Sequence, residues 1–113
     1  MSRKVVIKFI IDFRSYEYGY PHSILEDVFL SGYCYYFALI LQSRFGGEIL
    51  YDPVEGHFVT AIYDTYHNEY RLYDIRGEVT DKYKYKELYS QQVWSTIPSI
   101  VKGCILKESD YAI

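Results

Sequence analysis

The sequence predicts one small domain that combines a buried helix with a β-hairpin, and two patterns lead to this prediction. Residues 34–45 are apolar on nearly every side, as in a helix at the centre of a protein. Residues 57–63 and 70–75 alternate as two strands around a polar turn. The chain has 113 residues, half of them apolar, and shows no repeat, low-complexity segment or linker. Because a chain of this length buries roughly two thirds of its unfolded surface, we expect residues 1–113 to form a single domain.

Composition and charge narrow the class of protein. Charged residues make up 24% of the chain and the net charge is −3, which argues against disorder and against a charged tail. No stretch approaches the roughly twenty apolar residues that cross a bilayer, and the N-terminal residues 1–13 are interrupted by Lys8 and Asp12 and lack a cleavage site. We therefore expect a cytoplasmic protein that does not bind membranes. The sequence has no clustered basic face, so we expect no nucleic-acid partner.

The N-terminal third contains one open assignment and one predicted short helix. Residues 4–13 are rich in β-branched and aromatic side chains, which is compatible with a strand and equally with a short buried helix. Residues 16–23 contain glycine and proline and are expected to form a loop. Ser23 is a suitable cap for a short helix over residues 24–30, which the Ser-Gly pair at 31–32 would end.

The central helix is predicted from the spacing of its apolar residues. One helical face carries the residues at positions 34, 37, 38, 41 and 45, and the other side is apolar as well. No charged residue occurs between Asp27 and Arg44, so this helix is expected to be buried. Gly46 and Gly47 supply its C-terminal stop.

The second half of the chain reads as strands followed by weaker signals. Residues 48–51 predict a short strand that ends before Pro53, and the hairpin strands at 57–63 and 70–75 follow. The lysine and tyrosine alternation at residues 81–86 suggests an exposed strand or the approach to a helix. Residues 86–94 are compatible with a helix that Pro98 terminates, and residues 100–106 with a late strand.

Cysteine usage gives little reason to expect disulfides or metals. The two cysteines, Cys34 and Cys104, are too few for the disulfide-rich secreted class, so we expect two free thiols. Neither C-x-x-C nor H-x-x-x-H spacing occurs, and we expect no metal and no cofactor. Cys104 is expected to be a small buried residue, while His22 and His67 are expected to be exposed in loops.

Cys34, His57 and Asp74 have the chemistry and order of a nucleophilic site. A thiol attacks carbonyl carbon as the thiolate, which a helix N-terminus and a nearby imidazolium both favour. Cys34 begins the central helix, where its own backbone N–H could hold an oxyanion, and Gly32 would let a substrate approach closely. His57 begins a strand and could act as base and then as acid, while Asp74 would fix its tautomer.

The hairpin register decides which acid meets His57. Asp74 lies directly opposite His57 only if the hairpin is centred between Thr65 and Tyr66. If the turn is centred at residues 67–68, the two are offset by about four residues, roughly 13 Å along a strand, and Glu78 lies opposite His57. The sequence leaves both registers open.

The same segment resembles a known superfamily of cysteine-nucleophile proteins. The residues that carry the resemblance are 32–39 (GYCYYFAL), 46–47 (GG), 56–59 (GHFV) and 73–77 (YDIRG). They are similar to the core of papain-like and transglutaminase-like proteins, over roughly residues 30–78. The resemblance implies an α+β fold in which the central helix packs on a small antiparallel sheet.

The resemblance also implies roles for individual residues. It suggests Cys34 as nucleophile, His57 as general base and Asp74 as the orienting acid, with Tyr35 as the aromatic residue beside the cysteine. Many members place a side-chain donor such as glutamine before the cysteine, but no Gln or Asn precedes Cys34 here. Tyr33 or Tyr20 would then have to supply that contact.

Two functions follow as expectations. The first is a cysteine-dependent amide-bond hydrolase or acyl/glutamyl transferase that acts on a protein or peptide substrate through a thioester. The alternative is a non-catalytic binding protein on the same fold, for example a small phage or mobile-element inhibitor of a host factor. The small size, the acidic charge and the 15 tyrosines favour this second function, since tyrosine suits protein interfaces.

Overall fold

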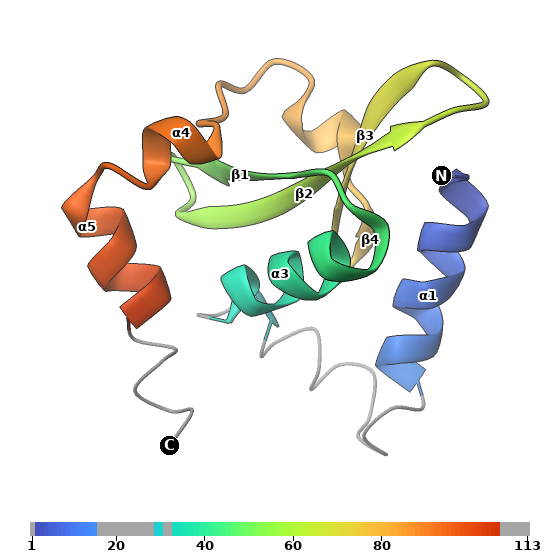
Figure 1. Ribbon diagram of the computed structural model, residues 1–113, viewed down its shortest axis with the longest axis horizontal. Coiled ribbons are helices and arrows are strands. Elements are labelled where there is room, and N and C mark those ends of the chain that lie inside the picture. Colours follow the sequence, from blue (N-terminus) through green and yellow to red (C-terminus); the bar gives the residue numbers. More distant parts are fainter. Residues whose placement is uncertain (1, 16–28, 31–32, 107–113) are drawn as a thin grey trace.

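The computed structural model describes residues 2–15, 29–30 and 33–106, and its architecture is α+β. Four antiparallel strands form one sheet in the order β1-β2-β3-β4. These strands are β1 (Glu48–Asp52), β2 (His57–Asp64), β3 (Glu69–Asp74) and β4 (Gly77–Glu78). Helices α1 (Arg3–Ser15) and α3 (Cys34–Phe45) pack against the sheet (Figure 1). The predicted loop at 16–23 and nearly all of the predicted helix at 24–30 lie outside the described residues.

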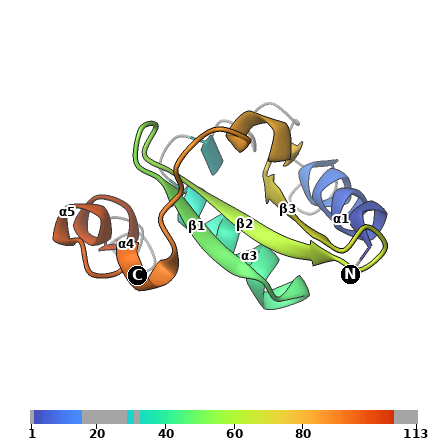
Figure 2. The same cartoon turned by 90° about the horizontal axis from the view of Figure 1, so that it is seen from above.

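Helix α3 confirms the predicted central helix at both ends. Its buried residues, Cys34, Phe37, Ala38 and Leu41, belong to the predicted apolar face. The backbone N–H of Gly46 donates to the carbonyl of Gln42 at 2.8 Å and closes the last turn. The Thr60 hydroxyl donates to the Ala38 carbonyl at 3.1 Å, which ties the helix to β2. Seen from above, α3 runs along β1 and β2, with α1 beside β3 (Figure 2).

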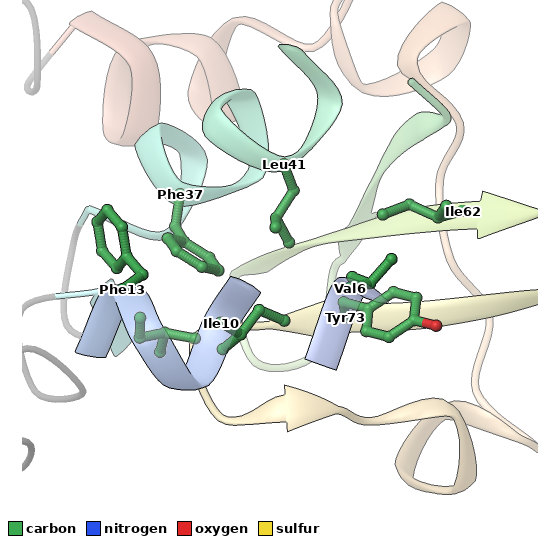
Figure 3. Close-up of a cluster of buried hydrophobic side chains, with 8 residues drawn as sticks. Val6, Ile10, Phe13, Phe37, Leu41, Ile62 and Tyr73 are labelled. Atoms are coloured by element: carbon green, nitrogen blue, oxygen red, sulfur yellow. The ribbon is translucent and has the colours of Figure 1, made fainter. Parts of the chain in front are cut away.

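Helix α1 settles the open assignment at residues 4–13. The buried side chains Val6, Ile10 and Phe13 recur every three or four residues, so an α-helix places them on one face. Lys8 and Asp12 form an ion pair at 2.7 Å on the exposed side. Figure 3 shows the buried face of α1 pointing toward Phe37 and Leu41 of α3. Packing on this amphipathic face outweighs the strand preference of the β-branched residues.

The register of the hairpin lies between the two that the sequence leaves open. Asp64 pairs with Glu69, and Thr60 pairs with Tyr73. The turn is therefore centred between Tyr66 and His67. Continuing this register places Asp74 opposite Val59, two residues from His57 and on the same face of the sheet.

The C-terminal part differs most from the sequence-based expectations. The predicted helix at 86–94 shortens to α4 (Gln91–Trp94), and the predicted late strand at 100–106 is wrong. Those residues are helical instead, in α5 (Pro98–Ile100) and η2 (Val101–Leu106). Pro98 begins α5 rather than ending a helix, because a first-turn proline has no N–H to lose. The lysine-rich run is partly the short helix η1 (Thr80–Tyr83), where Tyr83 is buried while Lys82 and Lys84 are exposed.

The segment before α4 covers the free edge of β1. Tyr51 and Tyr89 exchange backbone hydrogen bonds at 2.9 and 2.8 Å. The indole N–H of Trp94 donates to the Ile49 carbonyl at 3.0 Å. This pairing satisfies backbone groups that an edge strand otherwise exposes. Within the described ranges, no helix is long and apolar enough to cross a membrane.

Candidate active site

The three residues that the sequence selects come together at one end of the sheet. Cys34 is the first residue of α3, His57 is the first residue of β2, and Asp74 is the last residue of β3. The Nε2 atom of His57 lies 2.9 Å from Oδ2 of Asp74. Interactions with the Cys34 side chain help to raise the pKa of the same imidazole ring. Residues far apart in the sequence thus form an acid, imidazole and thiol series.

Cys34 lies in a largely apolar environment. Cys34 is 5% exposed and packs in a cluster with buried side chains from α3 itself, β1, β2 and the C-terminal helices, namely Ala38, Ile49, Tyr51, Phe58, Trp94 and Ile100. Tyr33 precedes it at the N-cap of α3 and makes no capping hydrogen bond with its side chain. The Tyr33 side chain therefore does not cap the first turn of α3.

His57 is positioned by the tight turn between β1 and β2. Oδ1 of Asp52 accepts hydrogen bonds from the backbone N–H groups of Val54 and Glu55 at 2.9 and 3.4 Å. The Gly56 N–H donates to the Asp52 carbonyl at 2.9 Å, and Gly56 has a φ of 66°, which glycine adopts without strain. Asp52 pairs with His57 across the two strands. The turn thereby fixes the point at which the histidine enters the sheet.

Asp74 is held by the turn that follows it. Its Oδ1 accepts the backbone N–H of Arg76 at 2.8 Å, an Asx-type turn that leads into Gly77 with a φ of 115°. The guanidinium of Arg76 contacts both carboxylate oxygens. Arg14 of α1 donates to the carbonyls of Ile75 and Arg76 at 3.2 and 3.3 Å, which anchors the turn to the helical layer.

The register makes the His57 and Asp74 pair a diagonal one. The two residues are offset by two positions, roughly 7 Å along the strand, and both point to the same face. The length of the imidazole side chain spans that offset. Glu78, the alternative acid, pairs instead with Tyr73 across the strands and forms ion pairs with Arg3 and Arg71. Asp74 is therefore the carboxylate that meets His57.

The electrostatics of the pair favour its charged form. Burial lowers the pKa of His57, but hydrogen bonds to Asp74 and Cys34 outweigh burial and raise this pKa to about 9. Burial raises the pKa of Asp74, but the hydrogen bonds from His57 and Arg76 hold it below its usual value. At neutral pH this pKa favours the protonated ring, which lies beside the Asp74 carboxylate.

The remaining predicted site residues lie partly beside the site and partly outside the described residues. Tyr35 is half-buried, with its ring packed against Phe58 and Trp94 at centroid distances of 5.1 and 5.8 Å. Tyr33 lies at the helix start, as described above. Gly32 and Tyr20, expected to contact substrate, lie outside the described residues, as do the side chain of Cys104 and the whole of His22. His67 is exposed as expected and lies 2.7 Å from Asp64.

Arg76 is the functional candidate that the sequence reasoning missed. The signal was present in the Asp-Ile-Arg-Gly sequence at 74–77, where an arginine follows the acid by two residues inside a turn. Such spacing brings a side chain back toward the residue that starts the turn. Among the described residues, no group of three or more His, Cys, Asp or Glu side chains is arranged to hold a metal ion.

Comparison with known proteins gives no relative from which a role could be transferred. No protein-family model matches the chain, and no characterised protein or solved structure matches it either. A functional conclusion therefore depends on the residues of the site.

Proposed function

We propose that this protein is a cysteine-dependent amide-bond hydrolase or acyl/glutamyl transferase on a papain-like or transglutaminase-like fold. The observation that carries the proposal is the 2.9 Å contact between His57 Nε2 and Asp74 Oδ2, on a ring that also interacts with Cys34. Because Asp74 occupies Nε2, Nδ1 is the ring nitrogen left to exchange a proton with the thiol. An imidazolium in this position stabilises a thiolate.

The reaction needs only the residues of this site and a second substrate. The Cys34 thiolate attacks the amide carbonyl carbon, and the oxyanion that forms is held by N–H groups at the start of α3. The His57 imidazolium gives its proton to the leaving amine as the C–N bond breaks, which leaves a thioester on Cys34. Neutral His57 then takes a proton from water or from an acceptor amine, whose attack releases the acyl group and restores the thiolate. Hydrolysis and transfer differ only in that acceptor.

Access to the thiol sets a condition on this chemistry. Cys34 is 5% exposed and the His57 side chain 7% exposed. A peptide carbonyl therefore reaches the sulfur only when side chains around it move. This condition favours an extended, narrow substrate segment over a bulky folded one.

Alkylation of the thiol tests the proposal directly. We expect iodoacetamide to label Cys34 at pH 6 to 7 faster than it labels a free cysteine, and His57→Ala to slow labelling about tenfold or more. His67→Ala is the matched control, since His67 is an exposed histidine outside this site and its loss should leave the rate unchanged. Mass spectrometry of the peptides separates Cys34 from Cys104. Labelling of Cys34 in the folded protein no faster than that of free cysteine would contradict the proposal, and the urea-unfolded protein, in which Cys34 reacts as an ordinary thiol, supplies the reference rate.

A second candidate function is supported by the exposed tyrosines. Tyr66, Tyr70 and Tyr85 are 81%, 61% and 93% exposed. Tyr70 stacks edge-on with Tyr63 at 5.1 Å on the outer part of the hairpin. Aromatic side chains in such positions are typical of protein-binding surfaces. If the protein is a binder of a host factor, substitution of Tyr66 and Tyr70 abolishes its effect while Cys34→Ala does not, and an enzyme gives the reverse pattern.

A further inference from the structure

The Arg76 side chain makes an unusually complete contact with Asp74. Its Nε atom lies 3.2 Å from Oδ1 and 3.0 Å from Oδ2, and Nη2 lies 2.5 Å from Oδ2. The backbone N–H of the same residue binds Oδ1 at 2.8 Å. A bidentate guanidinium fixes both the position and the plane of a carboxylate. Asp74 is 3% exposed, so this contact replaces the hydration that the carboxylate has lost.

Arg76 and His57 use the same oxygen of Asp74. Oδ2 accepts a hydrogen bond from Nε2 of His57 at 2.9 Å. The same oxygen accepts two more from the Arg76 guanidinium, from Nε at 3.0 Å and from Nη2 at 2.5 Å. A carboxylate oxygen that serves several donors is a weaker acceptor for each of them. Two cations that share one oxygen also repel each other. Arg76 therefore opposes the protonated form of His57, whereas Asp74 favours it.

The other charged and titratable groups around the pair do not take over this role. Cys34 faces the ring from α3, and Asp52 is its cross-strand neighbour on β1. Tyr83 of η1 has its pKa raised to about 12 by burial and by Asp74, and its hydroxyl stays neutral. Lys86 lies 3.6 Å from Asp52 rather than at Asp74. In the part of the chain that the structure describes, the ion pairs of Asp74 are with His57 and Arg76.

We propose that Arg76 is a positioning residue of this site, which fixes Asp74 and, by sharing Oδ2 with His57, limits how tightly Asp74 holds the imidazolium proton. This inference rests on the proposed function, in which His57 is the acid catalyst that must release its proton to the leaving amine. Efficient proton transfer requires a group that titrates near the working pH. By opposing protonation of the ring, Arg76 shifts the titration of His57 toward the working pH.

The test is an NMR titration of the His57 ring in the intact protein. We expect Arg76→Gln to raise the pKa of His57 by about one unit relative to the wild type, since a neighbouring cation is removed. Lys84→Gln removes an exposed cation that lies over the Tyr85 ring, and this matched change in net charge should leave the pKa unaltered. Backbone amide spectra of each variant verify the fold.

A merely structural role for Arg76 gives the opposite sign. If Arg76 only keeps Asp74 in place, its loss releases the carboxylate and the pKa of His57 falls. A fall, or a change no larger than that in Lys84→Gln, would overturn the proposal. If Arg76→Gln does not fold, Arg76→Lys provides the same test. A lysine ammonium cannot hold both oxygens, so we expect a smaller rise, and its absence would count against the proposal. The titration is independent of Cys34 alkylation, so failure of this inference and failure of the proposed function give different results.

Discussion

At the scale of single residues, the site is a short series of alternating charges in which His57 and Asp74 are buried and Arg76 is partly exposed. His57 and Arg76 each contact Asp74, and this carboxylate between the two cations is 3% exposed. Buried charges persist only when each is paired and hydrogen-bonded. Removing one partner leaves the other charge buried and unpaired. The resulting loss of folding stability is larger than the net stabilisation that the intact pair provides. The same contacts that stabilise the charged forms also set how His57 titrates.

The protonation of His57 makes stability depend on pH. Its pKa is about 9 in the folded protein and 6.5 ordinarily, so proton binding favours folding. This stabilisation is complete below pH 6.5 and is lost as the pH rises through about 9. We expect the free energy of unfolding of the wild type to decrease over this window by on the order of 3 kcal/mol more than that of His57→Gln. Urea unfolding at several pH values measures the difference, and parallel curves for the two proteins would refute it.

At the scale of elements, the junction between α3 and β1 depends on two glycines with different constraints. Gly46 and Gly47 have φ values of 77° and 95°, which residues with a side chain rarely adopt. A Cβ on Gly46 would meet no atom within 4 Å. A Cβ on Gly47 would lie 2.2 Å from the Ala61 carbonyl oxygen on β2. The second glycine is therefore required for close packing as well as for the turn.

This difference predicts unequal effects of one substitution at adjacent positions. Gly46→Ala introduces only backbone strain, about 1–3 kcal/mol. Gly47→Ala adds a steric clash with the sheet backbone, which we expect to cost about 1–3 kcal/mol more. Urea denaturation of both variants gives the comparison. Equal destabilisation would show that β2 does not approach Gly47 as closely as described.

At the scale of the whole molecule, Trp94 of α4 is the main residue that joins the C-terminal helices to the sheet. Trp94 is 2% exposed, donates its indole N–H to Ile49 on β1, and packs in the apolar cluster that contains Cys34. On the other face of the sheet, Val59 packs with Val79 and Tyr83 beneath η1. Apolar clusters on both faces connect segments from the start, middle and end of the described chain.

These connections predict that the chain unfolds as one unit, as the expected single domain requires. Trp94 is the only tryptophan in the sequence, so its fluorescence reports specifically on the contact between α4 and β1. Far-UV circular dichroism reports on all helices and strands. We expect the two signals to change together in a single urea transition. An earlier fluorescence transition would show that the C-terminal segment is a separate unit.

The sequence by itself determined the features that depend on neighbours in the chain. The apolar run that ends at two glycines specified the buried helix, and alternation around a polar turn specified the hairpin. The order of Cys34, His57 and Asp74 on these elements selected the candidate residues of the site, with Glu78 left open as the alternative acid. Periodicity and turn chemistry are local properties, so no tertiary information was needed.

Tertiary structure decided everything that depends on how distant segments meet. The sequence of residues 4–13 is compatible with strand or helix, and the packing of their apolar face on α3 selects the helix. The late segment at 100–106 became helical, although its apolar run resembles a strand. The observed hairpin register differs by two residues from each register that the sequence left open. Such a shift keeps every side chain on the same face of the sheet, so the alternation of apolar residues could not select it. That register brought Asp74 rather than Glu78 to His57, because hydrogen-bond partners across strands depend on how the strands pair and not on sequence spacing.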